Sequence, residues 1–67
     1  MTIKIYAQRN NEIKLAKIFK SKDNFKNQIK ALMYILHFKE YLKQNNLTNI
    51  SLLVNNEHLQ NIANTTI

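Results

Sequence analysis

Few side chains in this sequence have the types and spacing that catalysis requires. His37 and Glu40 stand three residues apart, a spacing that on a helix allows either a metal pair or a simple side-chain contact. His58 has no partner at a metal-ligand spacing, and Ser21 and Ser51 have no base placed to activate them. The chain contains no Gly and no Cys, which excludes a glycine-rich phosphate loop and thiolate metal ligation. We therefore expect no catalytic site, metal, cofactor or small-molecule substrate.

Basic and aromatic side chains offer a different chemistry, the binding of nucleic acid. Ten Lys and Arg against four acidic residues give a net charge of +6, and such a balance favours anionic partners. Lysines along the phosphates, beside rings on which bases stack, would bind a single strand. The candidate residues are Lys4, Tyr6, Lys14, Lys17, Phe19, Lys20, Lys22 and Lys26. The alternative is a solvated surface whose lysines reflect an AT-rich genome, in which Lys, Asn and Ile abound.

Apolar side chains in excess of one small core point to a protein partner. The second half of the predicted long helix carries an apolar patch on a separate side, and the second predicted strand adds two more exposed positions. The candidate residues are Tyr34, Ile35, Phe38, Tyr41, Leu42, Ile13 and Leu15. A homodimer or another protein would cover them. The alternative is contact with the short final helix through Leu59 and Ile62.

These side chains must be positioned by five predicted elements. The elements are a strand at 2–8, a strand at 12–21, a helix at 23–45, a strand at 50–54 and a short helix at 56–64. Asp23 and Asn56 are suited to begin the two helices, because their side-chain oxygens can accept hydrogen bonds from first-turn amides. Asn tolerates positive φ, so Asn10–Asn11 predicts the hairpin tip and Asn45–Asn46 the end of the long helix.

We expect a single α+β domain over residues 1–67, in the order β-β-α-β-α. A helical crossover predicts a three-stranded mixed sheet in the order 2-1-3, with the third strand parallel to the first and both helices on one face. A symmetric hairpin predicts one face with Ile3, Ile5, Ala7, Ala16 and Ile18 under the long helix. The open face would then carry Tyr6, Ile13, Leu15 and Phe19, with Lys4 and Lys17 among them. The helix would turn its apolar stripe, Phe25, Ile29, Leu32, Met33 and Leu36, to the core.

Two segments resemble parts of ribonuclease H-like domains. Residues 27–32 (NQIKAL) are similar to that family's first helix, where a catalytic Glu precedes an apolar run, and residues 50–59 (ISLLVNNEHL) are similar to its fourth strand, which ends in a catalytic Asp. The resemblance covers most of this chain but about half of a complete family domain. Gln28 and Asn55 stand at the two acidic positions, and residues 2–8 contain no acid. Because two-metal hydrolysis needs clustered carboxylates, the resemblance implies a relative without nuclease activity.

The sequence predicts a non-catalytic binding protein. It contains no apolar run long enough for a membrane span and no Cys, so we expect a cytoplasmic protein of a bacterial or other AT-rich host. Its partner would be another protein or a second copy, and its role that of an inhibitor or adaptor of the kind carried by phages and mobile elements. The alternative is a nucleic-acid-binding module that uses a basic, aromatic sheet face.

Overall fold

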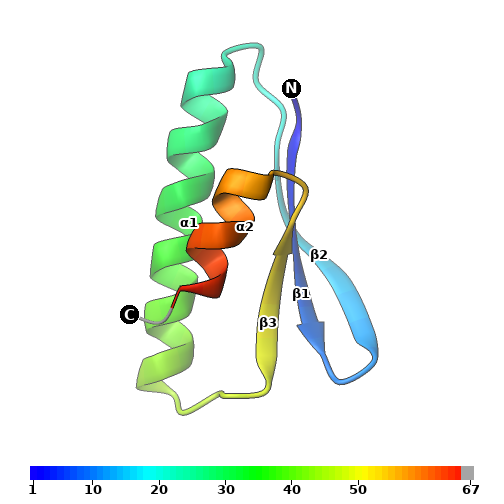
Figure 1. Cartoon of the computed structure of the whole chain (residues 1–67), viewed down its shortest axis with the longest axis vertical. Coiled ribbons are helices and arrows are strands. Elements are labelled where there is room, and N and C mark those ends of the chain that lie inside the picture. Colours follow the sequence, from blue (N-terminus) through cyan, green and yellow to red (C-terminus); the bar gives the residue numbers. More distant parts are fainter. Residues whose placement is uncertain (66–67) are drawn as a thin grey trace.

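The computed structural model describes residues 1–65, which form a three-stranded sheet and two helices (Figure 1). The elements are β1 (Ile3–Arg9), β2 (Glu12–Phe19), α1 (Asn24–Gln44), β3 (Ile50–Val54) and α2 (Glu57–Asn64). Side chains begin both helices as predicted, since Asp23 accepts from the amide of Lys26 and Asn56 from that of Leu59. Asn10 and Asn46 both adopt φ 56°, the left-handed region that Asn tolerates. The predicted element order and its capping residues are confirmed.

The sheet has the predicted strand order, β2-β1-β3, but β3 pairs antiparallel with β1. The prediction of a mixed sheet was therefore wrong. The right-handed crossover rule relates the two strands on either side of the helix, which here are β2 and β3. Because β2 runs antiparallel to β1, a third strand parallel to β2 must run antiparallel to β1 as well. Figure 1 shows α1 returning along the whole domain before β3 begins.

The hairpin keeps the predicted register only near its turn. Arg9 pairs with Glu12 and Ala7 with Lys14, but the register shifts between Ile5 and Tyr6, and Ala16 has no partner in β1. This β-bulge exchanges the faces of the rest of β2. Phe19 pairs with Ile3 and joins the helix side, whereas Ile18 pairs with Lys4 on the other side. The predicted faces of Lys17, Ile18 and Phe19 were therefore wrong, and Ala16 has no partner that assigns it a face.

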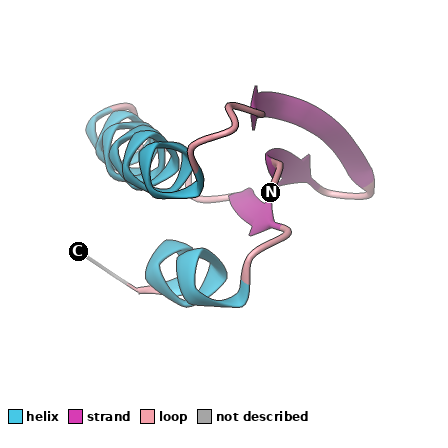
Figure 2. Cartoon of the chain, turned by 90° about the horizontal axis from the view of Figure 1, so that it is seen from above, coloured by secondary structure: helices cyan, strands magenta, loops and turns pink. Residues whose placement is uncertain are grey.

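The core is small and lies between the sheet and the two helices. The fully or nearly buried apolar side chains among the described residues are Ile3, Ile5, Ala31, Ile35, Leu52 and Leu59. Both helices contribute to this cluster, α1 with two side chains and α2 with one. In the end-on view the two helices lie together on one side of the strands (Figure 2).

α1 faces the sheet with a different side from the predicted one. Asn27, Ala31 and Ile35, spaced four residues apart, are its buried residues. The predicted core stripe points away instead, because Phe25, Ile29, Met33 and Leu36 are all exposed and only Leu32 packs against the core. The assignment of that stripe to the core was wrong.

Asn27 explains this rotation of α1. Its side chain is 1% exposed. Its Nδ2 donates to the carbonyl oxygens of Met1 (2.9 Å) and Ser21 (2.8 Å), and its Oδ1 accepts from the amide of Ser21 (3.1 Å). One side chain therefore ties the start of β1 and the loop after β2 to α1, and no buried side-chain N or O of residues 1–65 is left without a partner.

Replacing Asn27 should destabilise the whole domain. Asn27→Leu keeps the branched shape of the side chain but leaves three backbone groups without their partner, so we expect the free energy of unfolding to fall by about 2–4 kcal/mol. Urea denaturation followed by circular dichroism measures this. Gln28→Leu, at an exposed neighbour on the same helix, is the control and should change it by less than about 0.5 kcal/mol. Equal stabilities of the two variants would contradict the role of Asn27.

Candidate interaction surfaces

The first candidate surface is the outward side of α1, which we name the outer stripe: Phe25, Ile29, Met33 and Leu36. Phe25 is 72% exposed and Met33 53%. Their spacing of four, four and three residues keeps them on one side of the helix over about 17 Å. Isolated exposed apolar residues are common, but four on successive turns form a continuous patch. The sequence predicted the stripe correctly as a unit and placed it on the wrong side.

The second candidate surface is the side of the sheet that faces away from α1, which we name the open face. Cross-strand partners share a face, so the register assigns this side to Lys4, Tyr6, Gln8, Ile13, Leu15, Ile18, Ser51 and Leu53. Ile13 is 55% and Leu15 52% exposed. Leu15, Tyr6 and Leu53 form one apolar row across all three strands. Ile18 and Leu53 were not among the predicted interface residues.

The third candidate surface is an aromatic row between β2 and α1. Phe19 packs edge-on against Tyr34 at 6.3 Å, Tyr34 stacks on Phe38 at 5.9 Å, and Phe38 lies 6.4 Å from Tyr41, as distances between ring centroids. The Nζ of Lys17 lies 5.9 Å from the centroid of the Phe19 ring. The first three rings are half-buried and only Tyr41 is exposed, so the row shields the side of the core and presents one ring to solvent.

The structure divides the predicted nucleic-acid-binding residues between several places. Lys4 and Tyr6 lie on the open face, whereas Lys14 and Lys17 pair with Ala7 and Ile5 and so belong to the helix side. The bulge also moves Phe19 to that side. Lys20 and Lys22 lie in the loop before α1 and Lys26 in its first turn. The open face therefore carries one aromatic ring and one lysine, not the basic, aromatic groove expected there.

The predicted partner-binding residues are also divided. Ile35 is fully buried in the core, so its assignment to a surface was wrong. Tyr34 and Phe38 pack against the core, and Leu42 is half-buried at the far end of α1. Ile13, Leu15 and Tyr41 are exposed, but Tyr41 lies on a different side of the molecule from the two strand residues.

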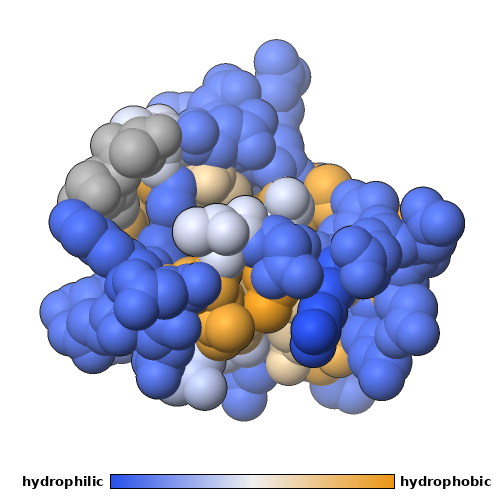
Figure 3. Space-filling view, turned by 90° about the horizontal axis from the view of Figure 1, so that it is seen from below, coloured by the Kyte–Doolittle hydropathy of each residue, from blue (hydrophilic) through white to orange (hydrophobic). Residues whose placement is uncertain are grey.

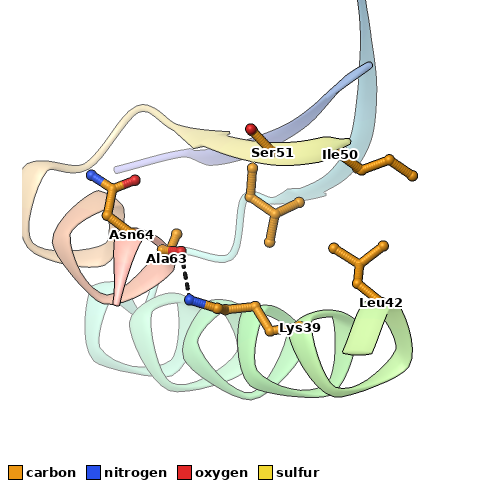
Figure 4. A pocket seen from close by; sticks show the side chains of 7 residues that line it. Lys39, Leu42, Ile50, Ser51, Ala63 and Asn64 are labelled. Carbon is orange, nitrogen blue, oxygen red and sulfur yellow. Dashed lines mark hydrogen bonds between the residues drawn. The ribbon is translucent and has the colours of Figure 1, made fainter. Parts of the chain in front are cut away.

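A cavity of about 320 Å³ opens at one end of the molecule, where α1, β3 and α2 meet. From below, hydrophobic atoms lie at the centre of this end within a hydrophilic rim (Figure 3). Leu42 and Ile50 face each other across the cavity, and Lys39 extends toward α2 (Figure 4). The Nζ of Lys39 donates to the carbonyl oxygens of Ala63 (2.7 Å) and Thr65, where it neutralises the C-terminal end of α2. The one charged group of the cavity thus already has a structural role.

The residues considered for catalysis are not brought together. His37 and His58 are exposed on different helices, and Gln28 is exposed on α1. Asn55 has a structural role, because its Oδ1 accepts from the amide of Lys4 (2.8 Å) and its Nδ2 donates to the carbonyl of Thr2 (3.0 Å), which extends the pairing of β3 with β1. Within residues 1–65, no three His, Cys, Asp or Glu side chains cluster in a way that would hold a metal ion.

The two edges of the sheet differ. The outer edge of β3 is covered by the side chain of Gln60, whose Oε1 accepts from the amide of Val54 (2.6 Å) and whose Nε2 donates to the carbonyl of Leu52 (2.9 Å). One carboxamide thus takes the place of a neighbouring strand. The edge of β2 carries a bulge and two lysines, Lys14 and Lys17, which are features that discourage pairing with another strand.

Comparison of the chain with family models, curated proteins and solved structures finds no match. The resemblance to ribonuclease H-like domains stays a prediction. Neither helix in the described part of the chain has the length and hydropathy to cross a bilayer.

Removing the Gln60 carboxamide should expose the β3 edge. Gln60→Ala leaves the amide of Val54 and the carbonyl of Leu52 without their partner, so we expect a loss of about 1–3 kcal/mol in the free energy of unfolding and faster aggregation on heating. Urea denaturation and light scattering measure the two effects. Asn61→Ala, at the exposed neighbour, is the control. A Gln60 variant as stable and as soluble as this control would show that the edge needs no cover.

Proposed function

We propose that this chain is a small protein-binding module, of the inhibitor or adaptor kind, that acts without catalysis. The outer stripe is the observation that carries this proposal. Full burial of a large apolar side chain is worth about 1.5–3 kcal/mol. The four side chains of the stripe are on average about half exposed, so about half of this free energy could still be gained at each of them by burial against a partner. Several kcal/mol are thus available to a partner that covers it. A domain of this size has few such side chains to leave in water.

The geometry of the outer stripe fits a helical partner. Its side chains recur at i, i+4, i+8 and i+11, with the half-buried Leu32 beside them at i+7. This is the spacing by which two helices interlock their side chains. A straight helix of three to four turns would cover the stripe from Phe25 to Leu36.

A pair of substitutions that introduces charge on the outer stripe should abolish partner binding and leave the fold intact. Phe25→Glu with Met33→Glu places two carboxylates in the proposed interface. Because both side chains are exposed, we expect the free energy of unfolding to change by less than about 0.5 kcal/mol per site. Affinity capture from a lysate of the host cell, read out by quantitative mass spectrometry, compares the variant with the wild type.

Gln28→Glu with Lys30→Gln is the matched control, because it lowers the net charge by the same two units at exposed positions of the same helix off the stripe. We expect the control to capture the same protein as the wild type. Capture of that protein by the stripe variant would contradict the proposal. A stripe variant that unfolds would show instead that the stripe has a structural role.

The binding of single-stranded nucleic acid is the second candidate function. The aromatic row supports it, because Lys14 and Lys17 lie on the same side of β2 as Phe19 and because Tyr41 is exposed at the far end of the row. Stacking requires free ring faces, and each of the four rings already lies against another ring of the row. For this reason we place it after protein binding.

Salt dependence tests the second candidate. If phosphates are bound, the affinity for a fluorescent oligothymidine should fall steeply with salt, and Lys17→Gln should reduce the slope of log K against log salt by about one. Tyr41→Ala should cost about 1–3 kcal/mol of binding if a base stacks there. Lys4→Gln, on the open face, is the control. Fluorescence anisotropy that detects no binding at low salt would eliminate this candidate.

A further inference from the structure

The open face has a composition that differs from the rest of the surface. Of the eight side chains that the register places there, Lys4 alone is charged, in a chain with a net charge of +6. The apolar row of Leu15, Tyr6 and Leu53 crosses its centre, with Ile13 and Ile18 on either side of Leu15 along β2. A sheet face of this kind normally packs on a second layer. No element of residues 1–65 covers it, since the core helices contact the side of Ile3 and Ile5.

The bulge at Ala16 produces this composition. With regular alternation, Lys17 would lie on the same face as Ile13 and Leu15, in the middle of the apolar surface. The shift turns Lys17 to the helix side, over the ring of Phe19, and puts Ile18 on the open face in its place. β2 thus keeps both of its central lysines, Lys14 and Lys17, off the open face. Bulges commonly re-aim side chains in this way.

We propose that a second copy of this chain packs on the open face, sheet against sheet, to form a two-fold dimer. The distribution of charge over the surface favours a second copy at this face. Two copies with a net charge of +6 each repel, and this repulsion favours contact through a face from which charge is nearly absent. The outer stripe does not meet this condition, because Lys22 and Lys26 flank its start.

The size of the open face is compatible with a weak dimer. Strands of this length make a face of about 23 Å by 14 Å, and two such faces about 10 Å apart bury on the order of 1,000 Å² in total. That area is at the lower limit for specific interfaces, so the dimer should form at micromolar and higher concentrations. Lys4 lies at the end of the face beside Ile18, where water can still reach its charge.

Sedimentation equilibrium over a range of concentrations tests the dimer. The wild type should approach twice the monomer mass. Leu15→Gln with Ile18→Gln puts two amides in the proposed interface and should weaken dimerisation at least tenfold. Met33→Gln with Leu36→Gln makes the same chemical change on the outer stripe and should leave it unchanged. Thermal melts of both variants establish that each is folded.

An introduced thiol gives a second measurement that does not depend on weakening the interface. The chain has no Cys, so one added residue is a unique reporter. Gln8→Cys, beside Ile13 on the open face, should be cross-linked by a short bis-maleimide at least ten times faster than Gln28→Cys on α1.

Three outcomes would overturn the dimer. These are a wild type that stays monomeric at the highest concentration, dissociation caused by the outer-stripe pair instead of the open-face pair, and equal cross-linking of the two cysteines. Because the open face and the outer stripe are separate, the dimer and the proposed partner can fail independently. If a protein no longer captures its partner but still forms the dimer, the result bears on the proposed function of the outer stripe and leaves the dimer proposal standing.

Discussion

The hydrogen bonds of one buried amide, Asn27, determine how α1 lies on the sheet. The side chain reaches backbone groups of Met1 and Ser21, so it must face the place where β1 begins and β2 ends. Ala31 and Ile35, one and two turns further on, then have to face the sheet as well. A buried amide that lost these bonds would cost about 1–3 kcal/mol, which is comparable to the gain from burying one large apolar side chain, so hydrogen bonding contributes to the rotation alongside hydrophobicity.

The rotation of α1 and the bulge in β2 together distribute the apolar side chains. Once Asn27, Ala31 and Ile35 face inward, Tyr34 lies beside Phe19 of β2 and Phe38 stacks on Tyr34. The outer stripe of Phe25, Ile29, Met33 and Leu36 then faces outward. The bulge brings Phe19 to the side where it meets Tyr34 and moves Ile18 to the open face. Two local features, one hydrogen-bonding side chain and one extra residue in a strand, thus leave two separate apolar surfaces uncovered.

The elements could be predicted because they depend on interactions between residues that are close in sequence. Their orientation could not, because it depends on interactions between residues that are far apart in sequence. Asp23, Asn56, Asn10 and Asn46 act through neighbouring backbone groups, so their roles could be inferred from the sequence. The rotation of α1 could not, because the helix has apolar residues on nearly every side and the bonds of Asn27 reach residues 6 and 26 positions away. The bulge in β2 lacks the Gly that often marks one, so nothing in the sequence indicated it. The direction of β3 was predicted wrongly because the crossover was taken to relate β3 to β1, whereas it relates β3 to β2.

The two uncovered surfaces lie on opposite sides of the domain, which gives the proposed dimer a particular architecture. The outer stripe is on the side of α1 turned away from the sheet, and the open face is the side of the sheet turned away from α1. A dimer joined through the open faces therefore keeps both copies of α1 on the outside, each with its stripe accessible. Such a dimer is bivalent, and avidity for a partner with two binding helices can exceed either single affinity by about 10²–10⁴. A weak dimer of a small domain would then bind a paired partner far more tightly than a single one.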